Sequence, residues 1–558
     1  MDPRGNVGMR NFPLQSQIQH LAINMAHTNE AIITFTEVDE LNSPISTYVY
    51  SEQGGNVEST RGRIDTVASS ASTSWSLDAF RSLLVDVFLP AGYPNSVSED
   101  YVSYQVFDSL QAFSSSIAGL LSSRAVLQGV GVGNADASPT SALLLHILQD
   151  TSGRIATILF AHRVGTALEP ECKMYRFAAD IFNDLAMVLD CLSPMIPAGV
   201  SRVSVLSAAG VLRALCGVAG GSSKASLSAH FAKWGNLAEV NAKDSSQETV
   251  ISLIGMLVGS LVVSYITSFT ATWLTLILLL ILHLSLNYAA VRSVQMTTLN
   301  RQRANIAFSA LLSSDPDATS LASDREGHLQ PKRRSGAKER EKLTKTILSP
   351  AQVARQERIF DAYGTLRWYP SSSDPASPSP SPETIGSCQI GVSLCQFLAD
   401  SSSSGSHGQT TASSRAIKTT LPLRELTSLF ADEDYILYLS TNGLSKIKAT
   451  ILLKQTSTPK SHLKAWAHAL LAVRVLSLRS SHSLGDNGFG KPGSNSEGVL
   501  SVLSRTLEYL IEEARFEGWV GSLRGVGWEI HDDLNGEEGK GGSALETSVG
   551  RRVVVAAS

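Results

Sequence analysis

"TVISLIGMLVGSLVVSYITSFTATWLTLILLLILHLSLNYAAV", residues 249–291, contains no Asp, Glu, Lys or Arg. As a single helix, this run of about 43 residues would be roughly 65 Å long at a rise of about 1.5 Å per residue. The hydrocarbon core of a bilayer is only about 30 Å thick. The stretch therefore predicts a transmembrane hairpin with spans at 250–267 and 273–290, joined by "SFTAT".

Positive charges flank both ends of this stretch, and its turn has none. The flanking residues are Lys224, Lys233 and Lys243 before it and Arg292, Arg301 and Arg303 after it. By the positive-inside rule, both flanks face the cytoplasm or its organellar equivalent. The alternative is a helical hairpin buried inside a soluble protein.

A polar segment directly precedes the first span. Lys243 and Gln247 are four residues apart, as are Asp244 and Glu248, so one helical turn presents both carboxylates on one side. Burying such groups unpaired in lipid is costly. Two arrangements avoid this cost. The segment either anchors the span among lipid headgroups, or it folds inward and lines a polar cavity, paired with a cation from Arg154, Arg292 or Lys224.

Four residues inside the spans could carry contacts. Gly255 and Gly259 form a GxxxG pair, whose small residues let two helices approach closely in lipid. His283 and Asn287 share one face of the second span. Polar groups at membrane depth turn inward or mark a pathway. The simpler alternative is that His283 bonds a neighbouring helix and Asn287 lies near the membrane interface.

Further upstream, charged residues interrupt the apolar segments, among them Asp150 and Arg154. These segments are nevertheless rich in small residues, such as Ser115, Gly119 and Ser123 in steps of four. This composition is typical of tightly packed helices. We expect either additional, less apolar spans around a polar interior or a packed helical domain outside lipid.

The bulk composition bounds the class of protein. Charged residues make up 17 % of the 558 residues, against about 25 % in typical soluble proteins, which favours membrane spans and uncharged linkers. A net charge of −4 gives no basic surface of the kind that binds nucleic acid.

The five cysteines form no CxxC pair, so no metal or redox site is predicted. The N-terminus has neither the apolar run of a signal peptide nor the acid-poor composition of a transit peptide.

Composition also divides the chain into five regions. We predict a disordered N-terminal region at 1–74 and a mainly α-helical, membrane-associated domain at 75–310. A basic and then Ser/Pro-rich linker at 311–416 leads to a small α+β domain at 417–530, with a flexible tail at 531–558.

The α+β domain is predicted from three segments. "YILYLSTNGLSKIKATILLK" reads as a β-hairpin with its tight turn at Asn442-Gly443. "PKSHLKAWAHALLAVRVLSL" and "EGVLSVLSRTLEYLIEEARF" read as amphipathic helices, separated by a loop at 480–498.

Catalytic signatures are weak. "GDNGFGKP", residues 485–492, matches GxxxxGK, but Pro492 replaces the Ser or Thr that would bind Mg²⁺. No HExxH or GxSxG motif occurs. A local echo between residues 129–142 and 217–230 ("GVGVGNADAS" and "GVAGGSSKAS") either marks duplicated halves, as in many transporters, or reflects shared Gly/Ala/Ser bias. We therefore predict no enzyme and no cofactor.

Four longer motifs follow one another along the chain: "FLPAGYPNSVSEDYVSYQVFDSLQAF", "RFAADIFNDLAMVLD", "WGNLAEVNAKDSSQETVISLIGMLVG" and "NYAAVRSVQMTTLNRQR". In this order and spacing they resemble the root UVB sensitive (RUS) family, whose domain is linked to vitamin B6. The C-terminal "HLKAWAHALLAVRVL" and "FEGWVGSLRGVGW" also resemble the family's tail. This chain departs from the usual pattern at Ser223-Lys224 and near Asn236, which puts ligand contacts in that region in doubt.

The resemblance implies a membrane-associated protein without an established catalytic activity, linked to UV-B responses and vitamin B6 homeostasis. Because "AKDSSQET" is part of the resemblance, it favours the inward arrangement of Asp244 and Glu248 over a simple anchor. Membrane lipid and a family-type homo- or hetero-oligomer are the expected partners. The compartment and any small-molecule ligand stay open.

Three functions compete at this point. The first is a non-enzymatic integral membrane protein that acts through partners in vitamin B6-linked or UV/stress homeostasis. The alternative is a multi-pass carrier of a small polar metabolite that uses inward-facing charges. A third is a pyridoxal phosphate enzyme, in which Lys224 beside the Gly/Ser-rich residues 220–223 would be the only candidate.

Overall fold

The computed structural model describes the chain in segments: residues 32–38, 44–52, 62–68, 84–130, 139–323, 347–370, 381–399, 421–442, 446–483, 495–530, 532 and 552–555. These residues divide into two compact units. The first contains those up to Val97 together with Lys233–Ser246, and the second contains Ser98–Ala232 and the residues from Gln247 on. We describe each unit by itself.

The first unit contains a three-stranded antiparallel sheet formed by β1 (Ile32–Val38), β2 (Pro44–Glu52) and β3 (Gly62–Ala68), in that order. The register pairs Phe35 with Tyr48, and Tyr48 with Thr66. The prediction of disorder for residues 1–74 is therefore wrong for these strands. Alternating β-branched and aromatic residues pair across strands, and this pairing outweighs the polar average of the region.

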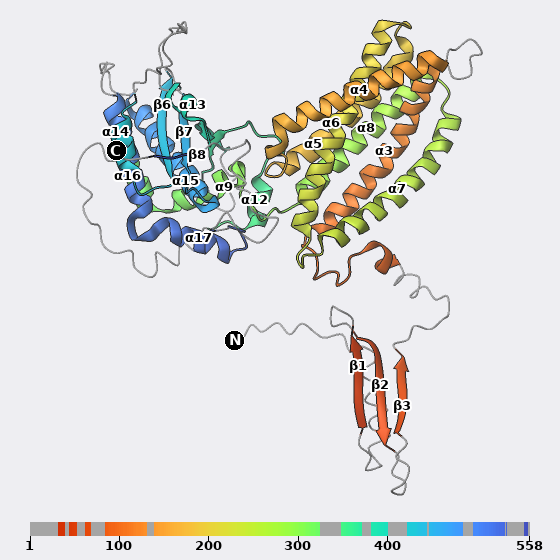
Figure 1. Cartoon of the computed structure of the whole chain (residues 1–558), viewed down its shortest axis with the longest axis horizontal. Coiled ribbons are helices and arrows are strands. Elements are labelled where there is room, and N and C mark those ends of the chain that lie inside the picture. The colour runs from red at the N-terminus through yellow and green to blue at the C-terminus, as the bar shows by residue number, and fades with distance from the viewer. Residues whose placement is uncertain are drawn as a thin grey trace. The chain divides into compact units, whose positions relative to one another are not determined.

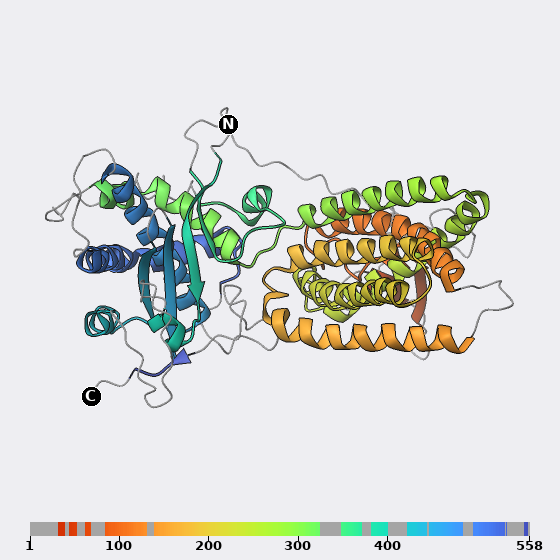
Figure 2. The same cartoon turned by 90° about the horizontal axis from the view of Figure 1, so that it is seen from above.

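Long helices dominate the N-terminal half of the second unit, where they run alongside one another (Figures 1 and 2). We call them the helical bundle. They are α3 (Tyr101–Val130), α4 (Pro139–Val164), α5 (Cys172–Leu192), α6 (Val200–Phe231), α7 (Leu237–Tyr265), which belongs to this unit from Gln247 on, and α8 (Phe269–Ser293). The main helix pairs are α5 with α6, α3 with α8 and α4 with α6. Short 3-10 turns, η1 (Gly165–Ala167) and η2 (Ser193–Met195), flank α5.

The predicted apolar hairpin is present as α7 and α8, but its turn is shorter than expected. α7 ends at Tyr265 and α8 already begins at Phe269, so most of "SFTAT" is helical. Ser268 caps α8 by accepting a hydrogen bond from the backbone N–H of Ala271 (3.3 Å). Arg124 of α3 donates to the carbonyls of Val263 (2.8 Å) and Ile266 (2.7 Å), and so satisfies the end of α7.

The GxxxG pair sits where α7 touches α3. A Cβ atom added at Gly255 would lie 2.8 Å from Cβ of Ser116, and one added at Gly259 would lie 2.7 Å from Cδ1 of Leu120. At Gly255 the backbone oxygen of Phe113 is also only 3.0 Å away, so a side chain there would push the two helices apart, whereas at Gly259 the end of the Leu120 side chain could move aside. The pair thus holds two helices of the same bundle together. Gly119 of the Ser/Gly ridge on α3 has no atom within 4 Å of its added Cβ, so that ridge makes no comparable contact.

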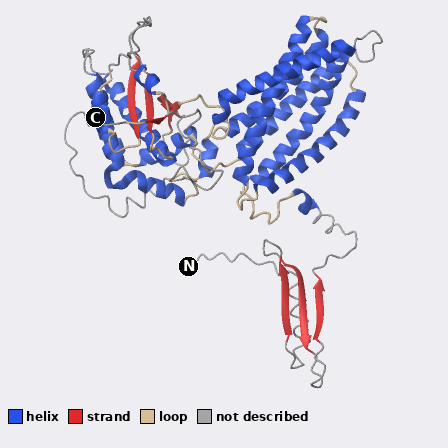
Figure 3. Ribbon diagram, viewed as in Figure 1, coloured by secondary structure: helices blue, strands red, loops and turns tan. Residues whose placement is uncertain are grey.

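The C-terminal half of the second unit is an α+β domain (Figure 3). Its sheet has the strand order β4-β5-β7-β6, with β8 also paired to β7. β5 and β7 are parallel, as are β7 and β8, whereas β4 and β6 are antiparallel to their neighbours. The strands are β4 (Thr365–Trp368), β5 (Glu383–Ile390), β6 (Tyr435–Asn442), β7 (Lys446–Lys454) and β8 (Arg552–Val553).

Helices complete this domain around one apolar core. Trp466 at the centre of α15 is fully buried and packs in the same core as Phe308, Tyr435 and Trp519. The helices are α9 (Arg301–Ser314), α10 (Pro316–Ser323), α12 (Pro350–Gln356), α13 (Leu394–Ala399), α14 (Leu423–Leu429), α15 (Pro459–Ser483), α16 (Asn495–Ile511) and α17 (Arg515–Gly525), with η3 (Glu512–Ala514) before the last.

The predicted hairpin and both amphipathic helices are confirmed as β6–β7, α15 and α16. The turn after Asn442 lies outside the described residues, as does most of the predicted loop at 480–498. The loop prediction is too long at both ends, because α15 reaches Ser483 and α16 begins at Asn495.

The predicted domain boundaries need correction. α9 packs in the core of the α+β domain, although residues up to 310 were assigned to the membrane domain. The predicted linker at 311–416 forms α10, α12, β4, β5 and α13 in its described parts, and the predicted tail contributes β8. In the short strand β4, Leu366 and Trp368 are buried in alternation with less buried residues. The average composition of the surrounding Ser/Pro-rich region does not reveal so short a pattern, so the sequence predicted a linker there.

Candidate functional site

Buried polar side chains from α3, α5 and α8 meet inside the bundle. Arg176 lies at the centre. Its Nη2 donates to Oδ1 of Asp108 (2.8 Å), its Nη1 donates to both oxygens of Asp180 (3.1 and 3.0 Å), and its Nε donates to the hydroxyl of Tyr104 (3.3 Å). The guanidinium therefore serves two carboxylates from two helices. We call this group the inner polar cluster: Asp108, Gln111, Arg176, Asp180, Asp184, His283 and Asn287, all of them buried.

His283 bridges the other side of the cluster. Its Nδ1 lies 2.7 Å from Oδ1 of Asp184, and its Nε2 lies 2.7 Å from Oε1 of Gln111. The Gln111 amide is oriented by its Nε2, which donates to Asp108 (3.1 Å). Both ring nitrogens of His283 thus face oxygen atoms, and an imidazolium, which carries a proton on each nitrogen, can donate to both of them at once.

The cluster gathers three carboxyl groups, those of Asp108, Asp180 and Asp184, around Arg176 and His283. Two of its groups also have open hydrogen-bonding capacity: Oδ2 of Asp184, and both side-chain amide atoms of Asn287, are buried without a partner among the described residues. Such groups are costly to bury unless a ligand, a water molecule or a second conformation satisfies them.

Helical spacing explains how the sequence builds the cluster. Arg176, Asp180 and Asp184 are each four residues apart, so α5 presents them as one stripe. His283 and Asn287 form the same kind of stripe on α8. Leu280 and Leu276, one and two turns before His283 on α8, are buried in an apolar cluster with Met187 of α5. On α8, the polar residues His283 and Asn287 are thus followed towards the N-terminus of the helix by buried leucines that pack on α5.

The predicted polar segment before the first span is only partly directed inward. Glu248 forms an ion pair with Lys224 of α6 (2.6 Å), and these side chains are 48 % and 25 % exposed. This ion pair therefore lies at the surface of the bundle, not in a deep cavity. Gln247 accepts a hydrogen bond from Nε2 of Gln105 on α3 (3.0 Å).

The other two predicted residues of this segment belong to the first unit. Lys243 donates to the backbone carbonyl of Asp86, and Asp244 is buried at 6 % exposure.

Four predicted residues lie apart from the cluster. Asp150 and Arg154 pair with each other on α4 and stay exposed. Neither Arg154 nor Arg292 provides the inward cation that the sequence suggested, since Arg292 donates to backbone carbonyls near α12. Lys224 lies within α6, and residues 220–223 are helical as well. They therefore form no phosphate-binding loop, which removes the basis of the pyridoxal phosphate hypothesis.

Sequence reasoning placed His283 and Asn287 together but missed the rest of the cluster. Its signal is the spacing of Arg176, Asp180 and Asp184 in "RFAADIFND", which puts three charged residues on one face of a single helix. Asp108 and Gln111 have no comparable pattern. The proposed echo between residues 129–142 and 217–230 falls largely on residues outside the described ones in its first half.

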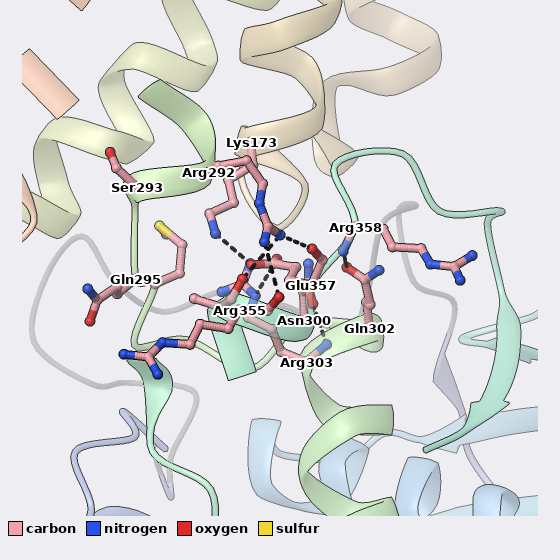
Figure 4. Close-up of polar contacts among 12 residues, drawn as sticks. Lys173, Arg292, Ser293, Gln295, Asn300, Gln302, Arg303, Arg355, Glu357 and Arg358 are labelled. Carbon is pink, nitrogen blue, oxygen red and sulfur yellow. Dashed lines mark hydrogen bonds and ion pairs between the residues drawn. The ribbon is translucent and has the colours of Figure 1, made fainter. Parts of the chain in front are cut away.

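A second buried charge cluster joins the bundle to the α+β domain (Figure 4). Glu357 follows α12, and its carboxylate binds Nζ of Lys173 (2.6 Å) and Nε of Arg303 (3.2 Å). Arg292 at the end of α8 donates to the backbone carbonyls of Glu357, Arg355 (3.0 Å) and Ala354 (3.3 Å). The guanidinium thereby satisfies carbonyls at the C-terminus of α12. We call this group the Glu357 junction: Lys173, Arg292, Arg303 and Glu357.

Opposite electrostatic environments act on two glutamates here. Burial alone would raise the pKa of Glu357, but the cations of Lys173 and Arg303 hold it below its ordinary value. For Glu171, burial raises the pKa from 4.5 to about 7, opposed by Arg303 and reinforced by Glu357. Its Oε2 accepts a hydrogen bond from Asn300 (3.1 Å). Folding therefore favours the protonated form of Glu171.

Glu171 should make stability depend on pH. The folded chain retains a proton that the unfolded chain loses, so we expect stability to be highest below pH 4.5, to fall between pH 4.5 and 7, and to level off above pH 7. Glu171→Gln should flatten this slope and raise stability at pH 8 by about 3 kcal/mol. Thermal unfolding of the purified chain from pH 5 to 8 measures it. Glu169→Gln, at an exposed position two residues earlier, should retain the slope. An unchanged slope in Glu171→Gln would contradict the assignment.

Comparison with known proteins places the bundle in a family. Residues 74–315 match the family model described as the vitamin B6 photo-protection and homoeostasis domain. The chain carries a RUS-family domain. This domain contains the whole helical bundle, including every residue of the inner polar cluster.

Curated relatives agree with this assignment. RUS family member 1 of Dictyostelium discoideum is 40 % identical over 233 residues, which cover 41 % of this chain and 44 % of the relative. Protein root UVB sensitive 3 of Arabidopsis thaliana is 34 % identical over 245 residues, which cover 43 % of this chain and 55 % of the relative. The match thus spans about half the length of these relatives. No solved structure matches the chain.

Proposed function

We propose that the RUS domain of this chain is a multi-pass membrane bundle, and that the protein acts without catalysis, through partner proteins, in vitamin B6-linked or UV/stress homeostasis. The observation that carries the membrane placement is the reversed polarity of the bundle. Ionisable side chains meet in its buried centre, whereas large apolar side chains are exposed over much of its outer surface. Soluble proteins have the opposite arrangement.

Three helices support this placement by length and composition: α6, α7 and α8 are long and apolar enough to cross a membrane. Large apolar side chains on α7 and α8 stay exposed, namely Leu253, Leu257, Leu261, Leu274, Leu278 and Ile281. An apolar surface of this extent is unfavourable in water but matches lipid. The α+β domain, tied on by the Glu357 junction, would then offer its surface to partners next to the membrane.

The membrane placement predicts a strong effect of charge at one exposed position. Leu278 is 66 % exposed near the middle of α8. Leu278→Asp should destabilise a membrane-embedded bundle by about 2.5–3.5 kcal/mol. On a water-exposed surface the same change costs about 0.5 kcal/mol or less. Leu394→Asp, at a 45 % exposed leucine of the α+β domain, is the matched control. The measurement is the thermal unfolding midpoint of each full-length variant in native membranes.

Alkaline carbonate extraction of membranes containing the full chain gives the second measurement. We expect the chain to stay in the pellet until detergent is added. Release by carbonate, together with equally mild effects of Leu278→Asp and Leu394→Asp, would mean that the bundle is a soluble hairpin assembly. Partner binding would then have to be sought on a soluble protein.

A transporter-like carrier is the second candidate, because Asn287 and Asp184 carry unsatisfied polar atoms inside the bundle. Such atoms suit a small polar metabolite that passes through. Uptake of a labelled vitamin B6 vitamer into vesicles that contain the purified chain separates the two functions. Uptake above that of empty vesicles favours the carrier, and its absence favours action through partners.

A further inference from the structure

In the described part of helix α4, contacts with the bundle are made to α6 and, through Phe160, to Tyr175 and Phe182 of α5. Its main neighbour is α6, and their backbones approach closely at two glycines. A Cβ atom added at Gly153 would lie 3.4 Å from Cβ of Ala214, and one added at Gly210 would lie 3.4 Å from the carbonyl oxygen of Gln149. Most of the remaining surface of α4 is exposed, including Leu143, Leu144, Ile147, Leu148, Ile155, Ile158 and Leu159.

An ion pair interrupts this exposed apolar surface. Nε of Arg154 lies 2.9 Å from Oδ2 of Asp150, and these side chains are 76 % and 56 % exposed. They lie roughly 17 to 22 Å along a helix of about 39 Å, which is its middle. The neighbouring Gly153 packs against residues 210–214 in the central part of α6, which is itself a candidate membrane span. The ion pair therefore lies at the depth of the membrane centre if the bundle spans the membrane.

Lipid is a poor environment for this pair. Charged side chains at the bilayer centre are costly and almost always face protein or a water-filled cavity. This step rests on the membrane placement proposed above. In the membrane, the exposed side of α4 has to be covered by a polar partner.

The residues around the ion pair have the pattern of a helix–helix contact. Leu143, Ile147, Asp150, Arg154 and Ile158 follow one another at steps of four, three, four and four residues, so they share one face of α4. Apolar residues thus lie on both sides of the charges. A polar residue within such a seam sets the register and the partner choice of paired helices.

We propose that two copies of this chain pair through α4 in the membrane, about a two-fold axis along the membrane normal, with each Arg154 bonded to the Asp150 of the other copy. The patch complements itself, because it carries one charge of each sign. Under a two-fold axis the contact of residue i with j is matched by that of j with i. The four charges then alternate around a ring with no net charge.

The donor count supports the ring. Only Nε of Arg154 bonds its own Asp150, whereas a guanidinium has five N–H donors in a fixed fork. The side chain of Arg154 points back along α4 to the level of Asp150. In a dimer about this axis, Asp150 of the other copy lies at the same depth in the membrane. The Nη groups of Arg154 can therefore reach that second carboxylate. A partner helix that carried only one charged residue at this depth could pair with either Asp150 or Arg154, but not with both.

Cysteine cross-linking tests the face of α4 that is used. Ile158 lies on the seam and is 68 % exposed, whereas the adjacent Leu159 points about 100° away around the helix and is 63 % exposed. In full-length chains with Cys395→Ser, which removes an exposed thiol, Ile158→Cys should form a cross-linked dimer in native membranes. Leu159→Cys should give at least tenfold less. Equal yields, or a cross-link from Ile158→Cys to a protein of another mass, would overturn the proposal.

Charge reversal tests the ring. Asp150→Arg makes a copy with two positive charges at the seam, and Arg154→Asp makes one with two negative charges. Each alone should lose the Ile158→Cys cross-link at least tenfold through repulsion. When the two are co-expressed with different tags, the mixed dimer should return to the wild-type yield, which shows that both variants fold. No recovery in the mixed pair, or no loss in the single variants, would refute the pairing.

Carbonate extraction of the same membranes separates this inference from the membrane placement. If the chain resists carbonate but Ile158→Cys does not cross-link, α4 pairing is wrong while the membrane bundle stands. If carbonate releases the chain, the membrane placement fails, and α4 pairing fails with it.

Discussion

Replacing Arg176 with Met should cause one of the two largest losses of stability in this chain, about 3–5 kcal/mol. Arg176 bonds Asp108 of α3 and Asp180 of its own helix, and all three side chains are buried. Without the guanidinium, two carboxylates stay in the interior with no cation between them. The thermal unfolding midpoint of the purified full-length chain in detergent measures the loss.

A charge-balanced variant serves as the control for Arg176. Arg176→Met combined with Asp108→Asn and Asp180→Asn removes the cation and both carboxylates while nearly keeping their volumes. Because the penalty comes from uncompensated charge, the triple variant should recover most of the stability lost in the single one. A triple variant as unstable as Arg176→Met would mean that packing, and not charge, is what Arg176 contributes.

Replacing Glu357 with Leu should have a comparable effect at the Glu357 junction. Lys173 and Arg303 would then keep buried positive charges without the carboxylate that both bind at 2.6 and 3.2 Å. We expect a loss of about 3–5 kcal/mol. Because Lys173 comes from the bundle and Arg303 from α9, the loss should appear as separate unfolding of the bundle and the α+β domain. Calorimetry of the full chain would detect two transitions in place of one.

Glu383 is the matched control for Glu357. It pairs with Arg474 at 2.8 Å, but its side chain is 61 % exposed. Glu383→Leu should therefore cost no more than about 1 kcal/mol and leave the unfolding transition single. Adding Lys173→Met to Glu357→Leu should recover part of the loss, since one of the two unpaired cations is removed. Equal effects of Glu357→Leu and Glu383→Leu would contradict the role given to the junction.

The parts of this protein that were predictable from sequence depend on residues close together along the chain. The uncharged run at 249–291 predicts α7 and α8, because apolarity and length are local properties. The alternation in "YILYL" and "KIKATILLK" predicts the β6–β7 hairpin for the same reason. The motifs shared with the RUS family identified the domain without any knowledge of the fold.

Long-range pairing lay beyond such reasoning. β5 pairs in parallel with β7 across more than fifty residues. Parallel strands are joined by a long crossover and not by a tight turn, so the sequence has no short turn motif that would predict this pairing. α9 directly follows the bundle in sequence, yet its Phe308 is buried in the core of the α+β domain. Which core an amphipathic or short helix joins depends on the surfaces available elsewhere, not on its own pattern.

The candidate site shows the same division. By itself, the sequence determined the apolar hairpin, the stripe of His283 and Asn287 on its second helix, and the family. Only the tertiary structure decided that Arg176 binds Asp108, that His283 lies between Asp184 and Gln111, and that Lys173 meets Glu357. Periodicity tells which residues share a face of one helix. The partner of a buried charge is settled only when helices distant in sequence pack together, because the cost of leaving that charge unpaired is paid in the assembled interior.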